Sequence, residues 1–202
     1  MIASASCAIT VRSALSAGSP GALLAFVFGA AIANVIRGVP LNAQGYFFEP
    51  LWTDLDPRSA TPGILDWYTV LIGLLALAAL ILHGANFLVT RCVGALEARA
   101  RRTAAQAWLA TLALTVLGTG ATFYVRPELL NSFAARPWGA VFPLLAIAGL
   151  FGTRALSTRA QDLKALVASG AYLAAMLASR FEKFTGSGSK ARTVIPGCCL
   201  AA

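Results

Sequence analysis

Charged residues are scarce in this chain. Of its 202 residues, 16 are Lys or Arg and 8 are Asp or Glu, which together make 12% of the sequence. Soluble domains usually carry about 25% charged residues. The low charge, a hydrophobic share of 58% and a mean hydropathy of +0.73 exclude a disordered chain and most water-soluble enzymes. We therefore expect an integral membrane protein, whose net charge of +8 reflects basic loops rather than a nucleic-acid partner.

Residues that bind metals or carry out catalysis are also few. The chain has one histidine, and its four cysteines, Cys7, Cys92, Cys198 and Cys199, show no C-x-x-C spacing. The sequence contains no Ser/His/Asp set, no paired carboxylates and no cluster with metal-ligand spacing. We therefore predict no catalytic, metal or cofactor-binding residue in this chain.

Five stretches without a formal charge predict an all-α, polytopic transmembrane helix bundle. The first three have 24, 24 and 23 residues and exceed the roughly 20 residues that a membrane-spanning helix needs. The fourth has 17 residues and is a probable span, and the fifth has 15 and is a partial one. The stretches are Ser13–Ile36, Trp67–Thr90, Thr103–Val125, Pro137–Thr153 and Ala165–Ser179.

The basic residues predict the orientation of these spans. If the spans alternate in direction, eight basic residues fall on one side and four on the other, and the larger group is expected in the cytoplasm. The larger group is Arg12, Arg91, Arg99, Arg101, Arg102, Arg154, Arg159 and Lys164. Aromatic residues gather at the predicted outer edge and suggest an interfacial belt: Trp67, Tyr68, Phe123, Tyr124 and Trp138.

A polar stripe follows the second span. It contains Thr69, Ala76, Ala79, His83, Asn86 and Thr90 at three- and four-residue steps. One interpretation places His83 and Asn86 in a proton path or a cofactor wall. The other, which we favour, makes them hydrogen-bonding residues between packed helices, as we also expect for Asn34 in the first span. The third span carries a small and hydroxyl face that predicts helix packing: Thr111, Thr115, Gly118, Thr119 and Thr122.

Four motifs in order resemble subunit II of the cytochrome bd family of quinol oxidases, including its cyanide-insensitive branch. They are Gly29 to Leu41, Gly45 to Pro50, Gly63 to Val70, and Leu82 to Arg99. The resemblance covers roughly residues 18–179. Its signature positions are Arg37, Gly38, Pro40, Asp66, Trp67, Gly84, Gly94 and Arg99. Arg37 lies at a span boundary, where it can reach the headgroups or pair with the acidic outer loop.

The resemblance implies a function for the whole complex. The family oxidises ubiquinol and reduces dioxygen to water in the bacterial inner membrane. The resemblance places haem b, haem d and the quinol site in a partner, subunit I. This multi-pass chain is then a subunit II without a haem of its own, and it contacts subunit I, lipid and quinone. Its role is to support assembly of subunit I, with Asn34, His83 and Asn86 as candidates for a polar seam between the subunits.

Family members are nearly twice as long as this chain, so the resemblance predicts a truncated member. We divide the chain into an N-terminal segment (1–17), a transmembrane domain (18–179) and a disordered basic tail (180–202). Two alternatives remain open. One is a small transporter or channel-like protein with a polar cavity at His83, and the other is a non-functional fragment.

Overall fold

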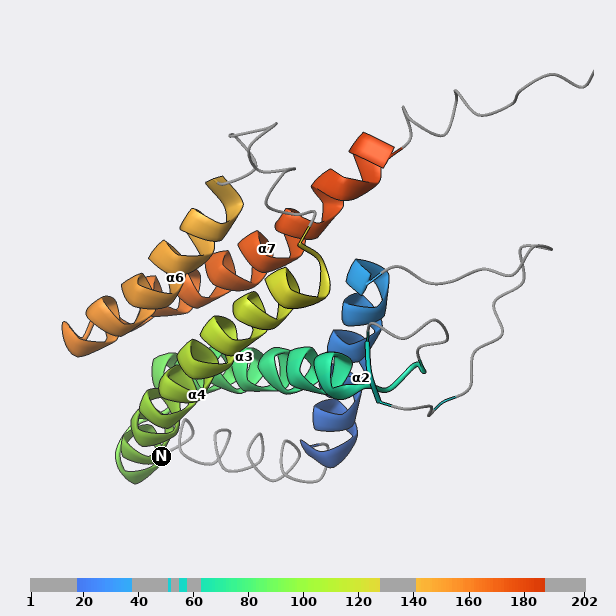
Figure 1. Cartoon of the computed structure of the whole chain (residues 1–202). Helices are drawn as coiled ribbons and strands as arrows, with labels where there is room; N and C mark the ends of the chain where they lie inside the picture. Colours follow the sequence, from blue (N-terminus) through green and yellow to red (C-terminus); the bar gives the residue numbers. More distant parts are fainter. Residues whose placement is uncertain (1–17, 38–50, 52–54, 58–62, 128–140, 188–202) are drawn as a thin grey trace, which may run out of the picture.

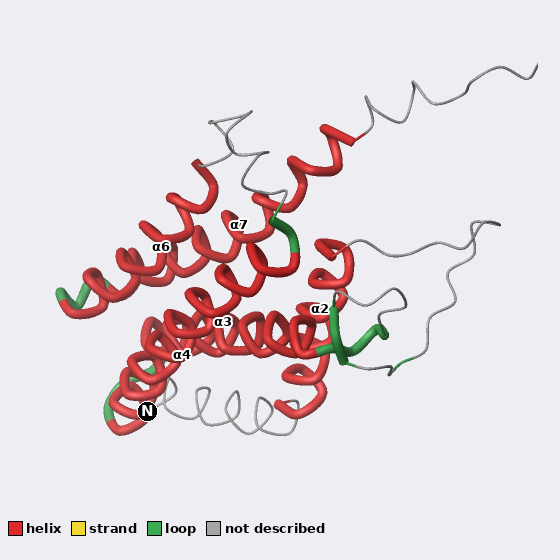
Figure 2. The backbone as a smooth tube through the Cα atoms, viewed as in Figure 1, coloured by secondary structure: helices red, strands yellow, loops and turns green. Residues whose placement is uncertain are grey.

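Five α-helices make up the part of the chain that the structure describes. The structure is a computed structural model, and it describes residues 18–37, 51, 55–57, 63–127 and 141–187. The helices are α2 (Gly18–Arg37), α3 (Trp67–Arg91), α4 (Ala95–Val125), α6 (Val141–Thr158) and α7 (Asp162–Ser187) (Figure 1). Short loops are the only other structure in these residues (Figure 2), which confirms the predicted all-α class.

Three of the helices are long and apolar enough to cross a membrane. These candidate spans are Pro20–Arg37, Trp67–Arg91 and Ala95–Val125. They correspond to the three long uncharged stretches of the sequence, so that prediction is confirmed. Helix α6, with 18 residues, covers most of the predicted fourth span.

Helix α3 begins where the sequence predicts, at Trp67, and its first turn shows why. Asp66 is the N-cap: its Oδ1 accepts a hydrogen bond from the backbone N–H of Thr69 at 2.8 Å. The hydroxyl of Thr69 in turn accepts one from the backbone N–H of Asp66 at 2.9 Å. This reciprocal capping box satisfies two backbone donors that the first turn of a helix otherwise leaves free.

Helix α4 is longer than the charge pattern predicts. It begins at Ala95, eight residues before Thr103, because an uncharged stretch marks the apolar part of a helix and not its end. The extra turns are rich in Arg, Glu and Ala, which are good helix formers, and they include an i,i+4 ion pair between Glu97 and Arg101. Gly94, which precedes the helix, has φ +75°, a conformation that residues with a Cβ rarely adopt.

Helix α3 is the centre of the bundle, because α2, α4 and α7 all pack against it. Small residues allow its close crossing with α2. A Cβ added to Gly29 of α2 would lie 2.6 Å from the Cβ of Ala76 and 2.9 Å from the Cα of Gly73. Two such helices approach closely only if the residues at the crossing are small, as is common in membrane bundles.

Two groups of buried apolar side chains form the core. The first joins α3, α4, α6 and α7, and consists of Ala79, Leu82, Ala85, Ala104, Ala107, Ala146, Leu150, Tyr172 and Ala175. The second joins α2, α3 and α4, and consists of Ala33, Ile36, Tyr68, Ile72, Leu75, Ala121 and Val125. Leu74 and Ile81, on the side of α3 away from these groups, are exposed.

The last two helices form a close pair, α6 and α7, which lie side by side in Figures 1 and 2. Their connection is a tight turn in which Ala160 has φ +54°. Helix α7 has 26 residues and ends at Ser187, so the fifth apolar stretch is part of a longer helix. The prediction of a disordered tail from Arg180 is therefore wrong for residues 180–187, which are helical, while residues 188–202 lie outside the described part.

Candidate functional site

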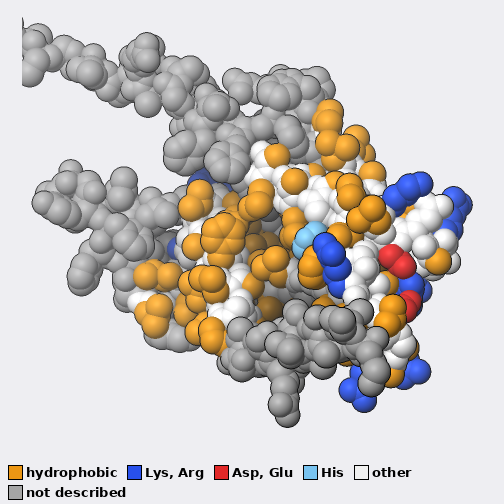
Figure 3. Space-filling view, turned by 180° about the vertical axis from the view of Figure 1, so that it is seen from behind, with side chains coloured by type: hydrophobic (Ala, Val, Ile, Leu, Met, Phe, Trp, Pro, Cys, Tyr) orange, Lys and Arg blue, Asp and Glu red, His pale blue; other side chains and the backbone are white. Residues whose placement is uncertain are grey.

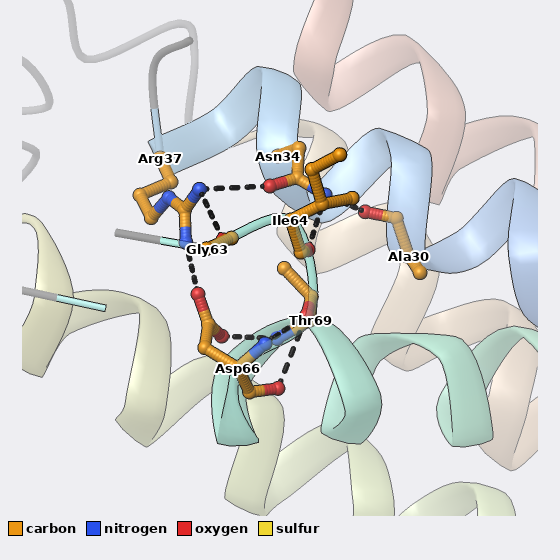
Figure 4. A network of polar contacts seen from close by, with 7 residues as sticks. All are labelled: Ala30, Asn34, Arg37, Gly63, Ile64, Asp66 and Thr69. Atoms are coloured by element: carbon orange, nitrogen blue, oxygen red, sulfur yellow. Dashed lines mark hydrogen bonds and ion pairs between the residues drawn. The ribbon is translucent and has the colours of Figure 1, made fainter. Parts of the chain in front are cut away.

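A polar network joins the end of α2 to the start of α3. We call it the Asp66 network, and it consists of Asn34, Arg37, Gly63, Ile64, Asp66 and Thr69 (Figure 4). Arg37 is the last residue of α2, and its guanidinium Nη1 pairs with Oδ2 of Asp66. Both residues are buried, with 6% and 1% of their surface exposed. Of the two alternatives for Arg37, the structure thus shows pairing with an acidic residue.

Further hydrogen bonds involve Nη2 of Arg37 and the second carboxylate oxygen of Asp66. Nη2 of Arg37 donates to Oδ1 of Asn34 at 2.9 Å and to the carbonyl of Gly63 at 3.0 Å. The other carboxylate oxygen of Asp66 caps α3. A buried ion pair is tolerated only when such bonds compensate for the lost hydration. The network therefore fixes the geometry between two membrane helices rather than offering a free acid or base.

Asn34 completes the network. Its Nδ2 donates to the carbonyl of Ile64 at 2.9 Å and to the carbonyl of Ala30 at 3.1 Å. The expected partner was a neighbouring helix, and the partners observed are the segment before α3 and the residue's own helix. The side-chain amide of Asn34 thus makes its hydrogen bonds within the chain.

His83 lies elsewhere on α3, 17 residues beyond Asp66 or about 25 Å along the helix axis. Its Nδ1 is 2.8 Å from the hydroxyl oxygen of Ser169 on α7. The Ser169 hydroxyl also lies 2.8 Å from the carbonyl oxygen of Leu166 on its own helix, and whether Nδ1 or the hydroxyl donates depends on the tautomer of the ring. This interhelical bond supports the packing interpretation of His83.

Asn86 is buried, with 4% of its surface exposed, and its Nδ2 has no hydrogen-bond partner in the described part of the chain. It makes no hydrogen bond to His83 among the described contacts. Within the described residues, Asn34, His83 and Asn86 are thus not joined to one another: the first belongs to the Asp66 network, the second joins α3 to α7, and the third is enclosed. Their place at a seam between subunits stays a prediction.

The hydroxyl face of α4 packs as predicted, except at one residue. Thr111, Gly118 and Thr122 are buried, and the hydroxyls of Thr115 and Thr122 lie 2.8 Å and 3.0 Å from the phenolic oxygens of Tyr172 and Tyr68. Thr119 is exposed. Sequence reasoning missed both tyrosines as polar partners.

Trp67 and Tyr124 form an exposed aromatic edge at the end of the bundle where α3 begins and α4 ends. Their ring centroids are 6.3 Å apart. Tyr68, which the sequence assigned to the same belt, is fully buried in the core because its hydroxyl bonds to Thr122. Trp138 lies outside the described residues.

Two of the other signature positions lie within helices. Gly84 lies in α3, with open space where a Cβ would be, and Arg99 is exposed on the first turns of α4. Gly38 and Pro40 lie outside the described residues.

The end of the bundle where α3 ends and α4 begins is basic. Figure 3 shows Lys and Arg side chains gathered there on the face in view, with acidic side chains among them. Arg101 of α4 donates to Asp162 of α7 at 2.9 Å and 2.8 Å, and to Glu97 at 3.0 Å. This bridge places the start of α4 beside the α6–α7 turn, as the alternating topology requires.

An apolar cavity of about 190 Å³ lies between α2, α3 and α7. Among the residues that line it are Gly29, Ala76, Leu80, Leu173 and Leu177, while His83 is not. The polar cavity that the transporter alternative predicts at His83 therefore finds no support in this pocket. Within the described residues, no group of three His, Cys, Asp or Glu side chains could hold a metal ion.

Comparisons with known proteins agree with this arrangement. The family model of the cytochrome bd terminal oxidase subunit II matches residues 10–184, which include all five helices but for the last three residues of α7. No curated protein matches the chain. Since the matched region covers most of the sequence, the chain belongs to the cytochrome bd terminal oxidase subunit II family.

Proposed function

We propose that this chain is the haem-free subunit II of a membrane quinol:dioxygen oxidoreductase, and that it supports assembly of the haem-bearing subunit I in the bacterial inner membrane. The family is that of a subunit of the cytochrome bd quinol oxidase, so haem cofactors, a subunit I and a membrane location follow for the complex as a whole. The match over residues 10–184 is the observation that carries the proposal.

The residues of this chain do not fit a haem. An axial ligand needs a free imidazole nitrogen pointing into a wide pocket, and commonly a second ligand opposite it. The single histidine, His83, does not line the apolar cavity between α2, α3 and α7, and α7 covers one edge of its ring, since an added Cβ on Gly170 would lie 3.6 Å from its Cε1. We therefore propose that oxygen reduction takes place in the partner, which holds haem b, haem d and the ubiquinol site.

The Asp66 network supports a structural role. In this network, four side chains and two backbone carbonyls hold the end of α2 against the start of α3, and the ion pair offers no free acid or base. A subunit that presents a preformed surface to a partner needs such rigidity, because ordering the helices at the moment of association would cost affinity.

Co-expression with a candidate subunit I tests the proposal. The complex should co-purify through a tag on this chain and show a reduced-minus-oxidised haem spectrum together with quinol oxidase activity. Subunit I expressed without this chain should yield less haem-loaded protein. Equal yield and activity with and without the chain would refute the assembly role.

A further inference from the structure

The seam between α3 and α7 changes from basic to polar to apolar along its length. On α3, Arg91 and Phe87 lie in the last turns of the helix, His83 with its partner Ser169 of α7 comes one turn earlier, and Leu80, which lines the apolar cavity with Leu173 of α7, comes about one turn before that. Each step is one helical turn, or about 5.4 Å. This order matches the order of chemical groups in a phospholipid, from headgroup through glycerol esters to acyl chain.

Arg91 provides a positive charge at the membrane boundary. It is the last residue of α3 and is exposed, and its guanidinium carbon lies 5.6 Å from the centre of the Phe87 ring. This position over Phe87 brings the charge back by one turn toward His83. The phenyl ring, itself exposed, holds the guanidinium by a cation–π contact.

The acidic residues at the same end of the bundle do not neutralise the charge of Arg91. In the sequence, segments 91–102 and 154–164 contain seven basic residues and two acidic ones, Glu97 and Asp162. Both acidic side chains bind Arg101. The surroundings of Arg91 therefore attract an anion, and basic groups at the ends of membrane helices are typical of sites for anionic lipid headgroups.

His83 and the cavity provide the rest of the site. The imidazole is half-buried and is visible among hydrophobic side chains on the face shown in Figure 3. Its Nδ1 is used by Ser169, which leaves Nε2 for a polar group beside the seam. The cavity beyond it is lined almost wholly by apolar atoms, and such a cavity stays dry and accepts hydrocarbon.

We propose that the α3–α7 seam binds one anionic phospholipid, with its phosphate at Arg91, its glycerol region beside His83 and one acyl chain in the cavity between α2, α3 and α7. This site goes beyond the assembly role and does not depend on it, because every residue in it belongs to this chain. The occupant is a lipid of the surrounding bilayer, selected by charge at Arg91 and by shape in the cavity.

Native mass spectrometry of the purified full-length chain tests the site by titration with phosphatidylglycerol and with phosphatidylcholine of the same acyl chains. The first phosphatidylglycerol should bind about fivefold more tightly than phosphatidylcholine, which is the contribution of one basic residue near an anionic headgroup. Arg91→Gln should abolish this preference. Arg91→Lys should retain it, since the charge remains.

Two further variants separate the site from general surface charge. Arg102→Gln removes an exposed charge of the same sign from the same end and should leave the preference unchanged. Leu80→Trp fills the cavity from an exposed position and should weaken the first binding event for both lipids. Equal affinities for the two lipids in the unchanged chain, or equal losses in Arg91→Gln and Arg102→Gln, would overturn the proposal.

Discussion

Arg37 and Asp66 form a buried ion pair between the end of one helix and the start of the next. Arg37 is the last residue of α2, and Asp66 caps the first turn of α3. The 28 residues between them in the sequence are thus closed into a loop by one contact. The relative position of the two helices depends on a charge pair that neither helix would tolerate unpaired.

Removing one partner should therefore destabilise the chain strongly. Asp66→Ala leaves Arg37 charged and buried, and also removes the cap of α3, so we expect a loss of about 3–5 kcal/mol in the free energy of unfolding. Thermal unfolding in detergent, followed by circular dichroism, measures it. The double variant Arg37→Met with Asp66→Asn should lose less than Asp66→Ala, because no unpaired charge remains. Single and double variants of equal stability would show that the pair is not coupled.

Two glycines in α2 provide a matched test of the helix crossing. Gly29→Ala places a Cβ 2.6 Å from that of Ala76, and overpacking of this kind costs about 1–3 kcal/mol. Gly21→Ala lies in the same helix, where an added Cβ meets nothing within 4 Å, so it should be neutral or slightly stabilising. Unfolding temperatures in the same detergent compare the two. Similar values would mean that α2 and α3 do not cross closely at Gly29.

Much of the fold could be predicted because charged residues flank the uncharged stretches that form its spans. The start of α3 at Trp67 was predicted correctly, since Asp66 both ends the uncharged stretch and caps the helix. The start of α4 was not, because Arg-rich turns continue a helix beyond the membrane boundary. Within the candidate site, the face that holds His83 followed from periodicity. Its partner Ser169 did not, since 86 residues separate them and periodicity does not reveal which helices are neighbours.

The hydrogen bond between His83 and Ser169 should make a modest contribution to stability. Ser169→Ala removes the hydrogen-bond partner of Nδ1, and we expect a loss of about 1 kcal/mol, typical of one hydrogen bond. In a double-mutant cycle, His83→Leu should cost less in the Ser169→Ala background than in the unchanged chain. Strictly additive losses would argue against the bond.

Haem content checks the assignment of cofactors to the partner. The chain expressed alone in detergent should show no stoichiometric Soret band, because its single histidine offers no second axial ligand. In the complex with subunit I, His83→Ala should leave the reduced-minus-oxidised spectrum unchanged. A band in the isolated chain that disappears in His83→Ala would identify this residue as a haem ligand.

The orientation in the membrane can be tested by thiol labelling in intact cells. The excess of basic residues predicts that the Arg91–Arg102 end is cytoplasmic. With the four native cysteines replaced by serine, Leu51→Cys should react with a membrane-impermeant reagent, whereas Arg102→Cys should react only after permeabilisation. Both positions are exposed, so accessibility within the protein does not decide the result. The reverse labelling pattern would invert the topology.

The separation of 86 positions between His83 and Ser169 also sets a time interval during synthesis. At about 5–20 residues per second, Ser169 leaves the ribosome roughly 4–17 seconds after His83. Helix α3 meets α2 and α4 first, and its remaining side stays open until the α6–α7 pair arrives. During this interval the imidazole depends on water, lipid or an insertion factor for its hydrogen bonds. A ribosome that slows before α7 would prolong the exposure, so synonymous codon changes between residues 91 and 162 could alter the yield of folded protein without changing one side chain.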